Sequence, residues 1–521
     1  MKWLRNPILW SGCFISSLFI WKIFFYKPSP EVTRISKQFV SVNLGIFPGS
    51  LNPQMIRTPQ DFFLASHLYE GLFRISSDGV LLPGLAEKME VSEDGLTYQI
   101  TLRTSYWSNG DPLTAHDFVR SWRSAVHSNS LLFCGFYLNF IDGQEKFTNL
   151  QYNQSSIAVR ADGEHLLVFS LKSPVSHFAN LLAIPVFFPI HANLNQIGYT
   201  SNGPFKVKSF DGVGQMILEK NPFFWDLSSV SFQFIKVLFM GRESQLSLFK
   251  KGDIDCIGFV PMSSDEVNYS LPVPSTFLRQ NIPVLLSLSV NTNFGILKSV
   301  KIRKAISMAL NREEFASISS NFYPPAYRFL PPAVISYPPL ESLIESPLEA
   351  KKLFKKGMED LNDIFSIDET LELCCVQTTS IIASVIQQQL RRTLGLETSI
   401  VIVDSSEFMR RMVGGDMELG IFQLIGNYGD PYSLFDYLFH CGRALCGWKS
   451  EKFGDIYKNG LGLKGFQRKL HCTEMERIVL SELPFIPLSF GYSPFLIQSG
   501  LRNVASVPYM SVDLTRAYWD K

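Results

Sequence analysis

The chain has 521 residues, more than a single hydrophobic core usually organises, so we expect two to four lobes. Its 48 Lys and Arg balance 47 Asp and Glu, and this formal net charge of +1 argues against a nucleic-acid-binding protein, which usually shows a basic excess. Hydrophobic residues make up 46% of the sequence and Phe alone occurs 43 times, so we expect large apolar cores rather than a disordered chain.

The N-terminal segment differs from the rest of the chain. A basic stretch at 1–7 precedes an apolar run at 8–26, which is long enough to span a bilayer with its basic flank inside. No A-x-A cleavage site stands before Glu31. We therefore predict that residues 1–30 are an uncleaved membrane anchor or an export signal, with lipidation at Cys13 as the alternative. In either case the bulk of the chain is exported.

The stretch from 90 to 126 is the most informative part of the N-terminal half. Alternating residues at 97–103 predict a strand between two turns that contain Gly. Thr114 is a good N-cap, and Asp117 stands three residues later, in the position that completes a capping box. An amphipathic helix is expected to follow.

The remaining elements are read from the period of the apolar residues. Strands are expected at 39–47, 166–171, 181–190, 205–210, 215–220, 232–239 and 284–293, and helices at 61–75, 242–252 and 299–315. After a proline-rich passage at 324–347, helices at 349–357 and 381–395 alternate with strands at 369–377 and 398–404, and strands return at 483–497. This alternation predicts an α/β lobe.

A short segment, GNYGDPY at 426–432, follows an apolar run at 417–425 that we interpret as a buried strand. Gly, Asn, Asp and Pro are turn formers, so the strand is expected to end in a sharp turn. Two interpretations stay open, an ordinary hairpin loop or a place where a ligand meets the end of the strand.

Residue types that carry catalysis or bind metals occur without a recognisable constellation. No G-x-S-x-G, H-E-x-x-H or P-loop motif is present, and the eight His are scattered. The His-Cys pairs at 440–441 and 471–472 fit no standard zinc spacing, and whether Cys441 pairs with Cys446 stays open. We therefore expect no enzymatic activity, no metal and no cofactor.

A series of segments in fixed order carries a family resemblance. It resembles the extracellular solute-binding proteins of oligopeptide and dipeptide ABC transporters over about residues 40 to 500. The matching segments are LYEGLFRI (68–75), LAEKMEVSEDGLTYQITLRTSYWSNGDPLTAHDFVRSW (85–122), SNGPFKV (201–207), LEKNPFFW (218–225), KKGDIDCI (250–257), VKIRKAISMALNREEF (300–315), EAKKLFKKG (349–357), IQQQLRRTLG (386–395) and MELGIFQLIGNYGDPYSLF (417–435).

The resemblance implies an α/β, three-lobed periplasmic-binding-protein fold, with two α/β lobes joined by a hinge and one extra lobe. Similarity gives lobe one as 38–73 with 187–290 and 490–521, the extra lobe as 74–186, and lobe three as 291–489.

The resemblance also implies a function. The chain is expected to be the substrate-binding receptor of an ABC importer, a monomer that captures oligopeptides by hinge closure and delivers them to a membrane permease. It would act in the periplasm or cell envelope, tethered to the inner membrane by its N-terminal segment. The alternative is the same fold with another small ligand, namely a modified or cell-wall-derived peptide, nickel, haem or a sugar.

The family's amine-binding aspartate follows the buried strand in a segment like W-x-A-D-Y-x-x-P. Tyr428 and Pro431 match this pattern, whereas Asn427 stands in the aspartate's place, Leu424 replaces the Trp, and Asp430 lies three residues further on. An Asn accepts a hydrogen bond from an ammonium but adds no charge. We predict ligand contacts from Asn427, Tyr428 and Asp430; either Asp430 reaches the amine or the ligand is not a standard free-amine peptide.

Four further residues, Tyr106, Trp107, Ser108 and Asn109, are candidates for ligand contacts. The alternative is that Trp107 fills the core of the extra lobe while Ser108 and Asn109 form a turn.

Overall fold

The fold was established from a computed structural model. It describes residues 38–47, 49–56, 58–76, 79–127, 135–143, 157–193, 200–260, 275–278, 281–318, 324–335, 342–361, 370–492, 495–507 and 511–520. Of the helices within these ranges, none combines the length and apolar character needed to cross a bilayer. The expected anchor at 1–30, including Cys13, lies outside the described residues.

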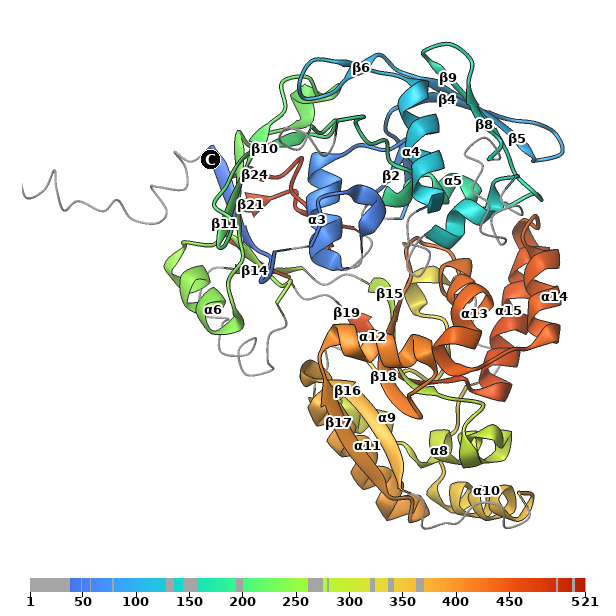
Figure 1. Cartoon of the computed structure of the whole chain (residues 1–521). Helices are drawn as coiled ribbons and strands as arrows, with labels where there is room; N and C mark the ends of the chain where they lie inside the picture. The colour runs from blue at the N-terminus through green and yellow to red at the C-terminus, as the bar shows by residue number, and fades with distance from the viewer. Residues whose placement is uncertain are drawn as a thin grey trace, which may run out of the picture.

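The largest sheet forms the centre of the part of the molecule that we call lobe one (Figure 1, blue and green). Within the described residues its strand order is β10 (Phe205–Phe210), β11 (Gln215–Lys220), β12 (Phe234–Leu238), β1 (Phe39–Asn43), β13 (Cys256–Ile257), β20 (Phe495–Gln498) and β14 (Ser275–Leu278). The central strand β1 pairs in parallel with β12 and β13 and is almost entirely buried, as expected for a strand covered on both faces.

A second sheet organises lobe three, the lower part of the molecule in Figure 1. Its described strands run in the order β17 (Thr398–Val403), β16 (Leu371–Val376), β18 (Leu419–Ile425), β15 (Asn281–Val290) and β19 (Phe485–Tyr492). Strands β14 and β20 belong to the large sheet, whereas β15 and β19 belong to the second sheet. The chain therefore passes from one sheet to the other between β14 and β15 and back between β19 and β20, and we call these two passages the crossings.

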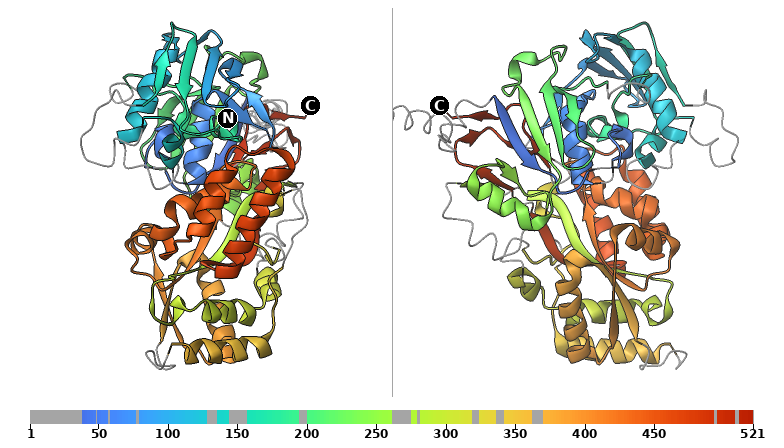
Figure 2. Two further views of the ribbon diagram at one scale, coloured as in Figure 1. Left: turned by 90° about the vertical axis from the view of Figure 1, so that its right-hand side faces the viewer. Right: turned by 60° about the vertical axis from the view of Figure 1, so that its left-hand side comes forward.

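Helices cover both faces of the lobe-three sheet (Figure 2). They are α8 (Val300–Ala309), α9 (Arg312–Ile318), α10 (Pro347–Glu359), α11 (Ser380–Leu394), α12 (Ser405–Gly414), α13 (Tyr432–Cys446), α14 (Glu451–Gly460) and α15 (Gly465–Glu482). Successive strand residues point to opposite faces, so Leu286 and Leu288 of β15 pack with α8 and α11 while Leu285 joins the core on the other side.

The extra lobe is built on a smaller antiparallel sheet. Its described strands run in the order β4 (Ala86–Val91), β5 (Thr97–Leu102), β9 (Leu166–Ser170) and β8 (Val159–Ala161). Helix α4 (Ala115–His127) packs on it, with the fully buried Trp122 edge-on to Phe169 at a centroid distance of 5.2 Å. The Asp117 carboxylate accepts the Thr114 N–H at 2.9 Å, so the predicted start of this helix is confirmed.

Short elements complete the three lobes. The paired strands are β2 (Phe73–Ile75) with β3 (Leu81–Pro83), β6 (Ser105–Tyr106) with β7 (Pro112–Leu113), β21 (Leu501–Arg502) with β24 (Tyr518–Trp519), and β22 (Ala505–Val507) with β23 (Ser511–Asp513). The remaining helices are α3 (Pro59–Leu68), α5 (Phe178–Leu181) and α6 (Arg242–Lys251). The 3-10 turns are η1 (Pro53–Met55), η3 (Gly135–Phe140), η5 (Pro185–Phe187), η6 (Leu227–Ser229), η7 (Gly295–Lys298), η8 (Pro332–Val334) and η9 (Gln377–Thr379).

Three expected elements differ from the structure. The helix expected at 61–75 ends at Leu68, because Tyr69 is extended and the chain then enters β2. The helix expected at 299–315 is two helices, α8 and α9, separated by an extended Leu310. The strand expected at 181–190 is wrong: this buried segment forms helical turns, since Pro185 starts η5 and lacks the N–H that a sheet requires.

A buried ion pair fixes α15 against the loop before η8. The Arg328 guanidinium donates to both carboxylate oxygens of Glu476, at 3.0 and 2.5 Å. One of these oxygens also accepts the backbone N–H groups of Phe329 and Leu330, at 3.1 and 2.9 Å. Both charged side chains are less than a tenth exposed. Buried pairs of this kind matter most when one partner is lost.

We predict that Glu476→Ala lowers the free energy of unfolding by about 3–5 kcal/mol, because Arg328 loses its buried counter-ion. The matched control is Glu474→Ala on the same helix, where the surface pairs with Lys452 and Arg477 should each be worth less than about 1 kcal/mol. Urea titration of both variants measures the difference. Equal losses of unfolding free energy in the two variants would show that the buried pair contributes no more to stability than the surface contacts of Glu474.

Candidate ligand-binding site

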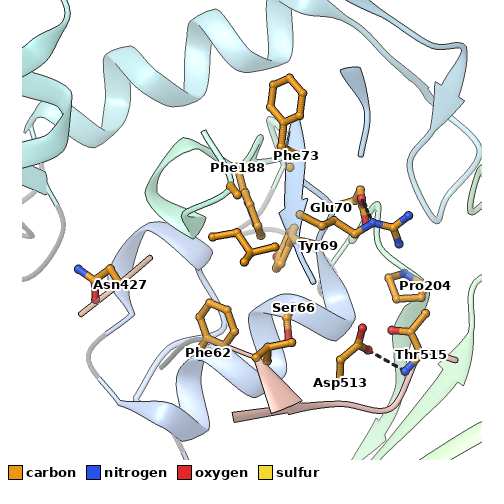
Figure 3. A pocket seen from close by; sticks show the side chains of 15 residues that line it. Phe62, Ser66, Tyr69, Glu70, Phe73, Phe188, Pro204, Asn427, Asp513 and Thr515 are labelled. Carbon is orange, nitrogen blue, oxygen red and sulfur yellow. Dashed lines mark hydrogen bonds and ion pairs between the residues drawn. The ribbon is translucent and has the colours of Figure 1, made fainter. Parts of the chain in front are cut away.

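A small cavity, partly open to solvent, lies where lobe one faces the end of β18 (Figure 3). Its lining residues come mainly from α3, β2 and the C-terminal hairpin β22–β23, with a single residue from lobe three. They are Phe62, Ser66, Tyr69, Glu70, Gly71, Phe73, Arg74, Ile75, Ala183, Phe188, Pro204, Asn427, Val507, Asp513 and Thr515.

The cavity wall is largely aromatic because the local sequence brings rings against a bare backbone. A capping box between Thr58 and Asp61 fixes the start of α3, which presents Phe62 to the cavity. Beyond the helix, a Cβ at Gly71 would lie 2.2 Å from the ring of Phe188, so only glycine lets this ring pack here. The result is an apolar surface suited to hydrocarbon or aromatic groups.

Two carboxylates and one guanidinium also line the cavity. The Glu70 carboxylate is 4% exposed and lies 3.4 Å from Nε of Arg74, which in turn lies 3.8 Å from Asp226. Burial raises the pKa of Glu70 to about 7, against the opposing effect of Arg74; the Asp513 charge adds to the increase. Glu70 is therefore only partly ionised near neutral pH.

Asp513 ends β23 and is about one-third exposed. Its Oδ1 accepts the backbone N–H of Thr515 at 2.7 Å and lies 3.8 Å from Nε2 of His67. That nitrogen accepts the Leu514 N–H at 3.0 Å, and burial lowers the pKa of His67, so the imidazole is neutral. Asp513 thus faces the cavity without a cationic partner among these contacts.

Asn427 is the lobe-three residue in the cavity lining. Its side chain is buried, and the amide donates to the hydroxyls of Tyr137 at 3.0 Å and Tyr437 at 3.3 Å. Tyr137 belongs to η3 of the extra lobe, so the hydrogen bond from Asn427 to Tyr137 also joins lobe three to the extra lobe. Figure 3 shows Asn427 on the far side of the cavity from Glu70 and Asp513.

Asp430 is outside the cavity lining and has a different set of partners. Its Oδ1 accepts from the Arg468 guanidinium at 2.6 Å and from the Tyr432 N–H at 2.9 Å. The same guanidinium donates to Ser176 Oγ at 2.7 Å and to His177 Nδ1 at 3.1 Å. Burial, with the adjacent Arg468, lowers the pKa of His177 to about 3, so this contact is to a neutral imidazole.

Tyr428 is outside the cavity lining and lies between lobe three and the extra lobe, where its ring stacks on His177 at a centroid distance of 5.5 Å. Its hydroxyl donates to the Asp436 carboxylate at 2.5 Å, and Tyr457 donates to the other oxygen at 2.7 Å. Asp436 is fully buried, and this desolvation raises its pKa to about 7 despite the two hydroxyls. The turn that follows β18 is therefore anchored at Tyr428 as well as at Asp430.

The other four sequence candidates lie in the extra lobe, and none is among the described residues that line the cavity. Trp107 is 1% exposed and meets His191 edge-on, whereas Tyr106 is 43% exposed. Ser108 exchanges hydrogen bonds with Ser201 at 2.7 and 3.1 Å. The Asn109 amide donates to Asp111 at 2.7 Å within the turn that joins β6 and β7.

Sequence reasoning missed Glu70, Arg74 and Asp513 as site residues. A signal existed for the first, since a carboxylate inside the apolar stretch LYEGLFRI needs a partner, and Arg74 stands four residues later. No pattern in the sequence predicts that Asp513 lines the cavity. It lies there because the C-terminal strands return to lobe one.

The thiols and histidines of the described segments were predicted to form no metal site. Among the described residues, no group of three or more His, Cys, Asp or Glu side chains could hold a metal ion. Cys441 and Cys446 are free and buried, and the Cys446 thiol donates to the Gly442 carbonyl at 3.2 Å. Burial raises the pKa of these thiols to about 11 and about 12, so neither is a reactive thiolate at neutral pH.

Comparison with solved structures identifies the fold as that of extracellular solute-binding proteins. The murein tripeptide binding protein MppA of Escherichia coli superposes with a TM-score of 0.82 at 21% identity, over 93% of this chain and 99% of that one. OppA of Listeria monocytogenes bound to peptide gives 0.79 at 20% identity, over 93% and 100%. The structure is thus a multi-lobed α/β periplasmic-binding-protein fold.

Sequence comparison then gives the family. The family model described as bacterial extracellular solute-binding proteins, family 5 Middle, matches residues 80–445. The oligopeptide-binding protein OppA of Bacillus subtilis is 25% identical over 511 residues, which cover 93% of each chain. This chain belongs to the family 5 bacterial extracellular solute-binding proteins.

We predict that Asp436 makes stability depend on pH. Its folded pKa of about 7 lies above the ordinary value of 3.8, so the folded state binds more protons between these values and stability falls as pH rises from about 4 to about 7. Asp436→Asn should remove this decline. The measurement is the melting temperature of the variant minus wild type across that range. An exposed control, Asp416→Asn, should leave the difference constant.

Proposed function

We propose that this chain is the substrate-binding receptor of an ABC importer and that it captures short peptides between lobe one and lobe three. The observation that carries the proposal is the cavity, which takes its lining from both lobes and combines an aromatic wall with a few polar groups. OppA of Bacillus subtilis, named an oligopeptide-binding protein, and the peptide-bound OppA of Listeria monocytogenes support peptide as the ligand class.

Closure about the two crossings is the mechanism we propose. The division expected from the sequence is kept, with lobe one at 38–73, 187–290 and 490–521, the extra lobe at 74–186 and lobe three at 291–489. One boundary is refined in this proposal: β15 pairs with β18 and β19, so the first crossing is placed between β14 and β15.

The proposed ligand contacts begin with Asn427, which lines the cavity. We retain Tyr428 and Asp430 as residues that hold the shape of the ligand-facing turn, through Asp436 and Arg468 respectively. Tyr106, Trp107, Ser108 and Asn109 are retained as candidates only for contact with a ligand that extends beyond the cavity toward the extra lobe.

A second ligand class is a modified or cell-wall-derived peptide. The observation that favours it is Asn427, which carries no charge where an aspartate is expected. MppA, described as a murein tripeptide binding protein, shares the fold. Nickel, haem and sugar are the remaining alternatives, and the ligand screen below separates them from peptides.

Partners and location follow from the same proposal. A receptor of this class hands its ligand to a membrane permease, acts as a monomer outside the cytoplasm, needs no cofactor and turns nothing over. The basic and apolar segment at 1–30 would hold it at the inner membrane of the periplasm or cell envelope, close to the permease.

Short peptides should raise the melting temperature of the purified protein, because a ligand that binds only the folded form stabilises it. At a hundredfold excess over the dissociation constant the gain is about 2.7 kcal/mol. Thermal shift with a mixed tripeptide pool tests this, with nickel, haem and sugars as controls, and mass spectrometry identifies ligand carried through purification. A shift with a control ligand and none with peptides contradicts the proposal.

Loss of the Arg468 contacts should weaken closure. Arg468→Met removes the donor shared by Asp430, Ser176 and His177, so the extra lobe and lobe three lose a bridge and peptide affinity should fall about tenfold. Lys469→Met, one residue further along α15 and exposed, is the control. Calorimetric titration measures affinity, and small-angle scattering measures closure. Unchanged values for Arg468→Met would remove this bridge from the mechanism.

A further inference from the structure

The amino group of a bound peptide needs an anionic partner, and the turn after β18 does not supply one to the cavity. Asn427 lines the cavity but is neutral, and Asp430 is committed to Arg468 at 2.6 Å outside the lining. A desolvated ammonium without a carboxylate can still donate hydrogen bonds to neutral acceptors, but it loses the attraction of an opposite charge. The partner must therefore be sought on another wall of the cavity.

Two carboxylates, Glu70 and Asp513, line the opposite wall, and both belong to lobe one. They are close enough for the Asp513 charge to act on Glu70. Figure 3 shows them on the same side of the cavity, with the Tyr69 ring between them in this view. Glu70 Oε1 is buried and makes no hydrogen bond within the described part of the chain, although Arg74 lies 3.4 Å away.

The cavity lining carries two carboxylates and one guanidinium, while Arg103 also acts on Glu70 from outside the lining. Arg74 is the cation in the lining, and it divides its contacts between Glu70 at 3.4 Å and Asp226 at 3.8 Å. Asp226 also receives Arg516 at 3.2 Å, and the His67 imidazole beside Asp513 is neutral. Two acids and one base therefore face the ligand, with aromatic rings alongside for its apolar part.

We propose that Asp513, assisted by Glu70, binds the free amino group of the peptide on lobe one, in place of an aspartate at position 427 on lobe three. This assignment rests on the proposed peptide-receptor function and names the group in that site that recognises the ligand's charge. The peptide then runs from the lobe-one wall toward Asn427, whose carboxamide meets a neutral part of the ligand.

Glu70 gives the assignment a second, independent signature. Its pKa of about 7 means that an arriving ammonium favours the ionised carboxylate, so affinity for a free amine rises as pH increases from about 5.5 to 7. An α-amino group, with its pKa of about 7.7–8.0, stays mostly protonated over this range. The other charges facing Glu70 are Arg74, Asp513, Asp226 and Arg103. Glu70→Gln should flatten the profile.

The experiment compares three probes by calorimetric titration at pH 6.5: a random tripeptide mixture without Lys, the same mixture acetylated at its amino ends, and an acetylated mixture with a central Lys. Wild type should prefer the free-amine mixture over the first acetylated one by at least about tenfold. Asp513→Asn keeps the acceptor for the Thr515 N–H but removes the charge, and should reduce this preference about tenfold without weakening the acetylated mixture.

Matched variants decide between the two lobes. Asp416→Asn, which changes an exposed lobe-three carboxylate outside the cavity lining, should leave the preference for a free amine unchanged. If the amine instead lies at position 427, Asn427→Asp will raise the preference and Asp513→Asn will not change it, which overturns the assignment. Tight binding of the acetylated Lys mixture, lost in Asp513→Asn, would overturn the amino-terminal assignment and show that the site takes a side-chain ammonium.

The outcomes also separate this assignment from the proposed function. No binding of any peptide mixture, with no thermal shift, refutes the receptor proposal and the assignment with it. Binding of free and acetylated mixtures with equal affinity in wild type refutes only the assignment. If Asp513→Asn lowers the melting temperature without ligand, the pH profile of Glu70→Gln still tests the same wall.

Discussion

The Arg468 guanidinium is the contact on which the arrangement around the cavity depends. It meets Asp430 from its own lobe and Ser176 and His177 from the extra lobe, and its plane lies over the Tyr432 ring at 4.3 Å. This guanidinium is only 12% exposed and needs such partners, since each missing one would carry a desolvation cost. The turn after β18 is thereby held in one conformation, and Asn427 is placed at the cavity edge.

The two walls of the cavity differ in how fully their polar groups are hydrogen-bonded within the protein. The lobe-three wall is structured by hydrogen bonds that are already made within the protein, through Tyr137, Tyr437 and Arg468. The lobe-one wall carries the carboxylates whose bonding capacity is less fully used. Such walls suit a site in which the hydrogen-bonded groups of lobe three keep the shape of the cavity while the carboxylates of lobe one bind the ligand.

Local sequence patterns predicted the parts of the fold that local forces determine. The start of α4 followed from Thr114 and Asp117, and strands such as β17 followed from alternation. The break between α8 and α9 and the helical turns near Pro185 were missed, because tertiary packing decides how short apolar segments are used. The order of the lobes came from the family resemblance and not from periodicity.

The site was less predictable than the fold. The sequence predicted that Asn427 follows the strand that became β18. The role of Asn427 depends on the cavity wall opposite it, which is formed by residues from the two ends of the chain. One sequence alone contains no sign that Asp513 approaches Glu70. Contacts between residues so far apart in the sequence form because the chain returns to lobe one, and patterns among neighbouring residues do not predict them.

The path of the chain also determines when lobe one can be completed. Strand β20 lies inside the large sheet, between β13 and β14, and the Trp519 indole donates to the Phe39 carbonyl at 3.3 Å. Residues of β20 are thus needed to finish a sheet whose central strand, β1, is made long before them. A growing chain cannot complete this sheet until β20 has been synthesised, so the pairing partners of β20 wait for it.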